Sequence, residues 1–387
     1  MARLYWIIAL AFGFLYGIVV GNLFPTHDLW ERIHGDVFGA LANVEAQRVL
    51  DPEPKARADL EAATNAKAIA AEKAATLDED LEFSIISENR DVLLSLRDRL
   101  REKIIPENDE GVILASRDGD DIILQTTYYG VQSKAVLSET PHPGSCLRVY
   151  IQGHDGDPFD AEHHNLLRNH FMEIGCDVLS MSMLGLGLNE GNAQFPARFG
   201  QVDLDMFEAR RHGNYALFFD ADNPQLDPLS LFIFPQYRMI AGLIDDYDNI
   251  AVLGISGGGW YVVWLAALMP EIDQSISYAG SLPLPYHQFG WNHGDWEQTY
   301  SAVYSTVSYI ELYQLMTLGD GENRPAYLVY NSDDPCCFRD PYASHFKRVS
   351  EGVPGLNYEV LIERSDTHSM NVELVKGLLE GDSKAHR

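Results

Sequence analysis

A serine set between glycines is the residue whose surroundings most directly suggest chemistry. The stretch Gly254–Gly258 has the pattern G-x-S-x-G and overlaps the end of an apolar run, Ile250–Ile255. A helical pattern follows at Trp260–Leu268 and ends before Pro270. A tight strand-to-helix turn exposes a serine hydroxyl, and the helix N-terminus favours the negative charge of acyl transfer. Ser256 is therefore a candidate nucleophile, although a glycine-rich turn or a phosphate cradle would share the pattern.

Two polar loops late in the chain could supply the partners of this serine. Strands are expected at 326–331 and 358–362, and the loops after them contain Asp333, Asp334 and His368. Open α/β sheets assemble their sites at the C-terminal ends of strands. A neutral imidazole can take the proton of a serine, and a carboxylate orients and stabilises that imidazole. The order serine, aspartate, histidine thus predicts nucleophilic catalysis.

The elements that must position these residues follow a change of pattern at Gly111. Strands without intervening helices come first, and strands alternating with helices follow, which implies parallel crossovers. We expect an α/β fold with a mostly parallel, doubly wound sheet and an antiparallel N-terminal edge. The expected strands are 111–116, 121–129, 131–137, 147–152, 176–182, 250–255, 326–331 and 358–362, with a helix at 161–174.

The N-terminal segment predicts a membrane anchor. Residues 4–24 are apolar over a length that spans a bilayer, and no small-x-small cleavage site follows them. Arg3 precedes this run, while Asp28 and Glu31 follow it, which favours an extracytoplasmic location for the rest of the chain. We therefore expect a single-pass transmembrane anchor at 1–25.

The glycines of this anchor lie on one helical face. Gly13, Gly17 and Gly21 could pair two such helices into a homodimer, although the ordinary glycine content of a membrane helix is the favoured explanation.

A helical stalk or linker is expected at 26–105, before a catalytic domain at 106–387. Residues 56–75 are rich in alanine and charge and suit a solvated helix. Apolar residues recur at helical spacing from Val92 to Ile104, so this second helix should pack on the catalytic domain.

Charge and cysteine content exclude several classes of function. A net charge of −29 argues against binding of nucleic acid or anionic lipid. Four cysteines are too few for a disulfide scaffold and lack zinc-site spacing. Cys336 and Cys337 are adjacent and could form a disulfide, but two free buried thiols are expected. The aspartates and histidines of 155–164 are interpreted as a solvated helix start rather than a metal site.

Taken together, these motifs resemble the α/β-hydrolase superfamily over roughly residues 111–380. The resemblance is to serine esterases of the dienelactone-hydrolase kind or to prolyl-oligopeptidase catalytic domains. The glycine-flanked serine matches the nucleophile elbow of that family, and 331–335 matches its acid loop. In this match Asp334 takes the position of the acid, with Asp333 as the alternative, and His368 takes the position of the base. Ser256 would attack the acyl carbon.

Two further segments fit the same family. Val149–Gly156 resembles a strand followed by His-Gly-x-x-Gly, with Gln152 in place of the usual histidine. The match implies that the backbone N–H groups of His154 and Gly257 form the oxyanion hole. Residues 182–191 resemble the glycine-rich loop after the next strand.

The resemblance implies a serine hydrolase that cleaves a small-molecule or glycan-linked carboxylic ester without a metal or organic cofactor, and the apolar run at 4–24 adds the expectation of a membrane anchor. A serine peptidase, an acyltransferase and a catalytically silent anchored binding module remain alternatives. Inserts are expected near 194–247 and 283–318. The aromatic residues of the second insert could shape an apolar or sugar-binding pocket, or simply pack its helices.

Overall fold

In the computed structural model, the described residues belong to the unit formed by residues 69–387. The predicted anchor, its glycine face and the alanine-rich segment all lie outside the described residues. Within the described part, no helix is both long and apolar enough to cross a membrane. The described residues are 89–106, 113–128, 131–141, 145–154, 156–190, 194–197, 200–203, 227–288, 294–351 and 355–381.

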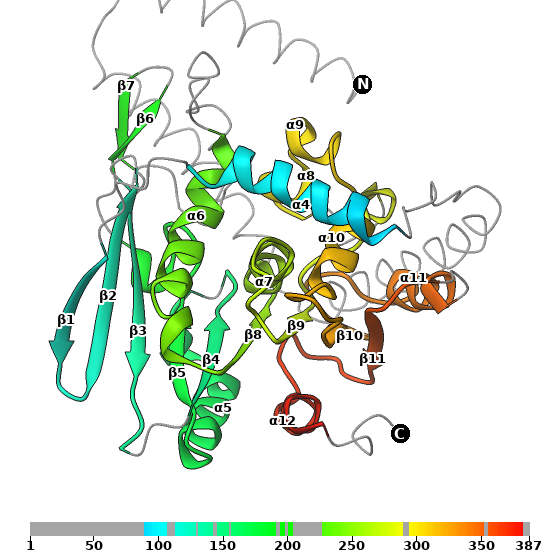
Figure 1. Ribbon diagram of the computed structural model, residues 1–387. Coiled ribbons are helices and arrows are strands. Elements are labelled where there is room, and N and C mark those ends of the chain that lie inside the picture. Colours follow the sequence, from blue (N-terminus) through cyan, green and yellow to red (C-terminus); the bar gives the residue numbers. More distant parts are fainter. Residues whose placement is uncertain are drawn as a thin grey trace, which may run out of the picture. The chain divides into compact units, whose positions relative to one another are not determined.

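A nine-stranded sheet forms the centre of this unit. Its strands are β1 (Leu114–Asp118), β2 (Asp121–Tyr128), β3 (Val131–Ser138), β4 (Cys146–Ile151), β5 (Asp177–Met181), β8 (Asn249–Ile255), β9 (Gln274–Tyr278), β10 (Ala326–Asn331) and β11 (Glu359–Glu363). They lie in the order β1-β2-β3-β5-β4-β8-β9-β10-β11 (Figure 1). The pairs from β1 to β5 are antiparallel, and those from β5 to β11 are parallel. The structure thus confirms a mostly parallel sheet with an antiparallel N-terminal edge.

Helices cover both faces of the sheet and form a separate core on each. The helices are α4 (Arg90–Ile104), α5 (Glu162–Glu173), α6 (Pro228–Ala241), α7 (Gly257–Leu268), α8 (Trp296–Thr299), α9 (Ser301–Tyr304), α10 (Tyr309–Met316), α11 (Tyr342–Glu351) and α12 (Val372–Glu380). One core joins α4, α6, α7 and α10 to the sheet, and the other joins α5 and α12 to it. A two-stranded hairpin, β6 (Gln194–Ala197) with β7 (Gly200–Asp203), precedes α6.

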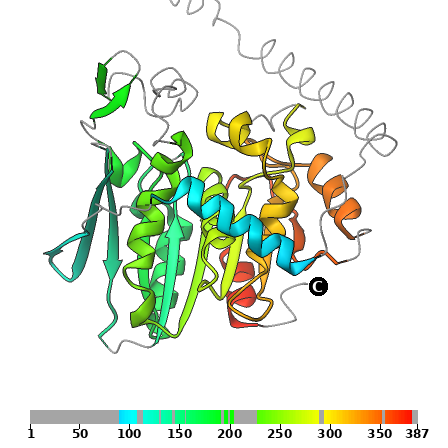
Figure 2. The ribbon, with the colours of Figure 1, turned by 45° about the horizontal axis from the view of Figure 1, so that its top comes forward.

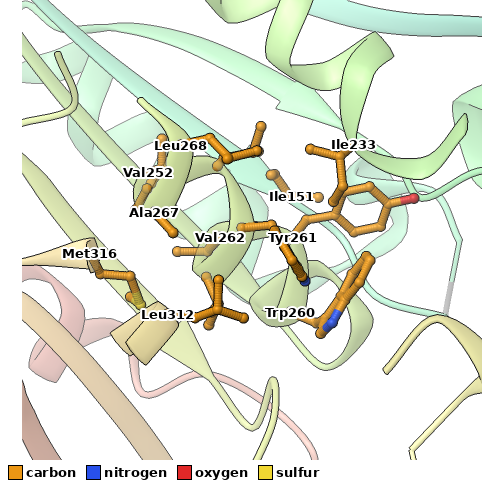
Figure 3. Close-up of a cluster of buried hydrophobic side chains, with 14 of the residues drawn as sticks. Ile151, Ile233, Val252, Trp260, Tyr261, Val262, Ala267, Leu268, Leu312 and Met316 are labelled. Carbon is orange, nitrogen blue, oxygen red and sulfur yellow. The ribbon is translucent and has the colours of Figure 1, made fainter. Parts of the chain in front are cut away.

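Helix α7 is buried at every position, because it is apolar on all sides. The sheet covers one side of α7, while α6, α10 and α4 cover the others, and α4 lies across this layer in both ribbon views (Figures 1 and 2). Figure 3 shows Trp260, Tyr261 and Val262 of α7 among side chains from two strands, α6 and α10. The helix that begins beside Ser256 is therefore held by packing on all sides.

Two buried guanidinium groups bond the backbone carbonyls where α7 and α10 end. Arg97 of α4 donates from Nε to the carbonyl of Ala267 at 2.8 Å, and from Nη2 to the carbonyls of Leu315 and Leu318. Arg324 donates to the carbonyls of Met269, at 2.8 Å, and Met316, at 2.7 Å. Helix C-termini leave such carbonyls without intrahelical partners, so these cations supply the missing donors. Burial lowers the pKa of Arg97 to about 10, which keeps it cationic at neutral pH.

Three elements differ from the expectations. Helix α7 starts at Gly257, directly after the serine, rather than at residue 260. Strand β9 was not predicted; its central positions alternate serines with Ile276 and Tyr278, and both kinds are buried. Helix α6, within the first expected insert, packs against β2, β3 and α7 as part of the core.

The segment expected to be a solvated helix start is partly buried. Asp157 caps the short 3₁₀ helix Pro158–Asp160 by accepting the N–H of Phe159. His164 is 1% exposed, and its Nε2 lies 2.8 Å from Ser180 Oγ. Burial lowers the pKa of His164 from 6.5 to about 4. The interpretation of this histidine as solvated is therefore wrong, because its ring fills space between α5 and β5.

Replacing Arg97 by methionine should lower the free energy of unfolding by about 2–4 kcal/mol, because three buried carbonyls lose a charged donor. Urea titration of the full-length chain, followed by tryptophan fluorescence, measures this change. Arg99→Met on the exposed side of the same helix is the control and should change stability by less than about 0.5 kcal/mol. Equal stabilities of the two variants would contradict the role given to Arg97.

His164 should make the fold acid-sensitive. The unfolded chain binds a proton at this histidine below pH 6.5, whereas the folded chain resists it until about pH 4, so stability falls as pH drops through this window. Between pH 7 and pH 5 the loss from this group should be about 2 kcal/mol. Urea titrations at both pH values should show a smaller loss for His164→Gln than for the parent chain.

Candidate active site

Ser256 occupies a strained turn between β8 and α7. Its backbone has φ 56° and ψ −130°, outside the regions that side chains favour, and it caps the N-terminus of α7. Its N–H donates to the carbonyl of Tyr278 at 2.8 Å, and its carbonyl accepts the N–H of Trp260. The residue is 8% exposed. Such strain persists because the surrounding hydrogen bonds and the packed helix hold the turn in place.

The glycines around Ser256 permit backbone contacts that no side chain would allow. A Cβ on Gly258 would lie 2.1 Å from the carbonyl oxygen of Ile151, and one on Gly254 would lie 2.5 Å from the carbonyl oxygen of Gly258. A Cβ on Gly153 would lie 2.7 Å from Cβ of Ser256. The loop after β4 is therefore pressed directly against the serine. Gly153 lies within the segment Val149–Gly156 that resembles His-Gly-x-x-Gly, but the sequence did not predict its contact with Ser256.

The structure joins His368 to Asp334. His368 Nδ1 lies 2.8 Å from Oδ2 of Asp334, whose side chain has no solvent exposure. The other carboxylate oxygen accepts the backbone N–H groups of Cys336, at 2.7 Å, and Cys337, at 3.1 Å. With both oxygens engaged, this carboxylate is fixed in the orientation that holds the imidazole.

Asp333, the alternative acid, lies elsewhere. Its side chain is exposed and accepts a hydrogen bond from Ser332 Oγ at 3.1 Å, while its backbone N–H donates to the carbonyl of Ser365. The geometry therefore favours Asp334 as the partner of His368, and Asp333 as a residue of the loop surface.

A buried network connects the serine turn to the histidine loop. Tyr278, whose carbonyl binds Ser256, donates from its hydroxyl to Oδ1 of Asn331 at 3.2 Å. The amide of Asn331 in turn donates to the carbonyls of Thr367 and Ser369, which flank His368. Burial raises the pKa of Tyr278, so its hydroxyl stays protonated as the donor. Sequence reasoning gave neither side chain a role: Asn331 was quoted only as the first residue of the acid loop, and β9 was not predicted.

The two residues expected to form the oxyanion hole lie next to each other. A Cβ on Gly257 would lie 3.0 Å from Cε1 of His154 and 2.3 Å from Sδ of Met183, so the imidazole of His154 lies against the elbow. His154 Nε2 is also 2.9 Å from Oδ2 of Asp295. The side chain of His154 therefore links the loop after β4 to the residue before α8, beyond the backbone role expected of it.

The predicted glycine-rich loop supports the loop that carries His154. Ser182 Oγ donates to the carbonyl of Gly156 at 3.0 Å, and Asn189 Nδ2 donates to the carbonyls of Ser182 and Met183. Gln152, which replaces the usual histidine, is 2% exposed and accepts the hydroxyl of Tyr150. Gln152 is thus a buried structural residue rather than a pocket wall.

The aromatic residues of the second insert mostly pack against one another. Tyr304 and Tyr309 stack at 4.8 Å between ring centroids, and the indole N–H groups of Trp260 and Trp264 both donate to the Tyr304 hydroxyl. Tyr286, Tyr304, Tyr309 and Tyr313 are all at most 8% exposed. These four residues therefore belong to the hydrophobic core, as expected if the aromatic residues of the insert pack its helices rather than line a pocket.

All four cysteines are paired in disulfides, Cys146 with Cys176 and Cys336 with Cys337. The expectation of free buried thiols at the second pair is therefore wrong. Cys336 is exposed.

The described residues also contain two clusters of possible metal ligands. One consists of Cys336, Cys337 and His368, and the other of His154, Asp295 and Glu297.

No protein-family model matches this sequence, and no curated protein matches it either. Solved structures do resemble it. Acetyl xylan esterase 1 from Thermoanaerobacterium sp. JW/SL YS485 is 17% identical, with a TM-score of 0.47 over 75% of this chain and 94% of its own. Est1E from Butyrivibrio proteoclasticus is 16% identical, with a TM-score of 0.43 over 68% and 98%. A carbohydrate esterase family 15 glucuronoyl esterase from Caldicellulosiruptor kristjansonii is 11% identical, with a TM-score of 0.45 over 74% and 83%.

The chain has an α/β fold with a mostly parallel sheet. Its mostly parallel sheet places Ser256 after β8, Asp334 after β10 and His368 after β11, each at a C-terminal strand end. This is the arrangement that the sequence motifs predicted.

For the ester hydrolysis expected from the sequence motifs, Asp334→Asn should lower kcat by about 10³–10⁴-fold, because the histidine loses the carboxylate that orients and stabilises it. Asp333→Asn, one residue away and exposed, is the matched control and should stay within about twofold of the parent. Steady-state kinetics of the two full-length variants makes the comparison. A larger loss in the Asp333 variant would reassign the acid.

Proposed function

We propose that this protein is a serine hydrolase that cleaves carboxylic esters through an acyl-enzyme intermediate. The observation that carries the proposal is the hydrogen bond of buried Asp334 to His368, on loops at the same edge of the sheet as the Ser256 elbow. A serine at a helix N-terminus, a histidine, and a carboxylate that fixes the histidine are the groups that acyl transfer needs.

The proposed reaction assigns one task to each group. Ser256 Oγ attacks the acyl carbon while His368 takes its proton, and Asp334 stabilises the imidazolium that forms. The backbone N–H groups of Gly257 and His154 stabilise the oxyanion of the tetrahedral intermediate. His368 then protonates the leaving alcohol, and a water molecule, activated by the same imidazole, releases the acid and regenerates the serine.

The substrate class proposed is a small-molecule or glycan-linked ester. A carboxylic ester needs only the groups named above, with no cofactor to carry its chemistry. One of the structures similar to this chain is Est1E with bound ferulic acid, which makes a feruloyl ester a useful member of a first substrate series.

We also propose that the chain is anchored in a membrane by residues 4–24, with the catalytic domain on the extracytoplasmic side. The apolar run and its flanking charges support this proposal. The Cys146–Cys176 disulfide is consistent with it, since disulfides persist in oxidising compartments.

Ser256→Ala should reduce hydrolysis of p-nitrophenyl acetate, butyrate, octanoate and ferulate by at least about 10⁴-fold, because no other group replaces the nucleophile. The full-length chain should also react with a fluorophosphonate probe at Ser256, and Ser305→Ala, at an exposed serine, should keep both properties. Release of p-nitrophenol measures turnover, and the preferred acyl chain gives the size of the acyl pocket.

The same experiment separates the alternatives. If the chain hydrolyses none of these esters and the probe does not label Ser256, the proposal is overturned in favour of a silent binding module. If the probe labels Ser256 but the acyl group of the ester is transferred to an added sugar rather than to water, the chain is an acyltransferase. If it cleaves peptides but no ester, it is a peptidase.

A further inference from the structure

We propose that Cys336 and Cys337, once reduced, form a binding site for a soft divalent cation together with His368. The site would bind Zn²⁺ or Cd²⁺, for which thiolate and imidazole ligands are suited. Its existence does not depend on the proposed function, but its effect, inhibition of ester hydrolysis, rests on it.

The three residues are already within reach of one ion. The two sulfurs and a ring nitrogen of His368 all lie within 4.8 Å of one another. Cys336 is exposed, and Cys337 and His368 are partly buried, so a reductant and then a cation can reach them from solvent. Ligand atoms at this spacing need only small movements to reach the bond lengths of about 2.0–2.3 Å that zinc adopts.

The hydrogen bonds of the acid loop prepare the imidazole for this role. Asp334 holds Nδ1 of His368, and the proposal assigns the other ring nitrogen, Nε2, to the cation. A histidine that bonds a carboxylate through one ring nitrogen and a metal through the other is the usual arrangement around zinc, because the carboxylate raises ligand basicity. The same Asp334 also accepts the N–H groups of both cysteines, so one carboxylate positions all three ligands.

Reduction requires an external dithiol, which the proposal names as co-reactant. One thiolate of the dithiol attacks a sulfur of the Cys336–Cys337 disulfide and forms a mixed disulfide. The second thiol of the reductant displaces the protein sulfur, so the reductant is oxidised to its own disulfide and both cysteines become thiols. Binding of the cation then releases the thiol protons.

Occupancy of this site should abolish the proposed hydrolysis. His368 Nε2 is the atom that must take the proton of Ser256, and a cation bound there removes that base.

The other disulfide offers an internal comparison. Cys146 and Cys176 lie at the N-terminal ends of β4 and β5, at the opposite edge of the sheet from His368, and Cys176 is buried.

The test uses the full-length chain, reduced with dithiothreitol and freed of it by gel filtration without air. Titration with Cd²⁺ should produce the ultraviolet thiolate-to-cadmium charge-transfer band and saturate at one equivalent. Ester hydrolysis should fall by about tenfold or more with the same midpoint and return when a chelator removes the ion. The unreduced chain should show neither effect.

Three variants locate the site. Cys336→Ser with Cys337→Ser should lose the band, whereas Cys146→Ser with Cys176→Ser should keep it. His368→Ala should keep a band but bind Cd²⁺ about 10–100-fold more weakly, because one ligand is gone. Absence of the band in the reduced parent, or its loss only in the Cys146 and Cys176 variant, would overturn the proposal.

The band separates this proposal from the function proposed above. If the chain hydrolyses no ester, the cadmium band and its dependence on His368 still test the metal site. If hydrolysis depends on Ser256 but Cd²⁺ leaves it unchanged after the band has saturated, the cation does not occupy Nε2 and the inhibitory site is refuted.

Discussion

The close approach of the first turn of α7 to the end of β4 is the constraint on which the site depends. The carbonyl of Ile151 occupies the space that a side chain on Gly258 would fill, so helix and strand meet backbone to backbone. This contact holds Ser256 at φ 56° and brings Gly153 against it. Because α7 is buried along its whole length, the strained turn cannot relax by moving the helix away.

The other half of the site is organised by the carboxylate of Asp334. One of its oxygens bonds His368, and the other accepts two backbone N–H groups of its own loop. Tyr278 and Asn331 then connect this region to the serine turn through buried side chains. Asp334 and His368 are thus fixed by direct contact, and the sheet links them to Ser256 through Tyr278 and Asn331, which limits reorganisation of these groups during a reaction.

Sequence patterns predicted the fold well where local signals were strong. The apolar run before Ser256 and the strand before Asp334 lie in β8 and β10. Strand β9 was missed because buried serines alternate with its apolar residues, so its hydrogen bonding to neighbours, rather than its hydrophobicity, defines it. The order of the motifs also predicted Asp334 and His368 as partners. The contact of His154 with Asp295 was not predicted, because the two residues are far apart in the sequence and no local pattern indicates their contact.

Helix α4 is part of the core that holds α7. Its residues Leu93, Leu96, Leu100 and Ile104 belong to the same core as α7. Arg97 donates to the carbonyl of Ala267 in α7 and to the carbonyls of Leu315 and Leu318 where α10 ends. A fragment that started at about residue 105 would expose this core and leave those carbonyls without their donor. A truncated form for expression or crystallisation therefore has to retain the chain from Asn89, whose side chain caps α4.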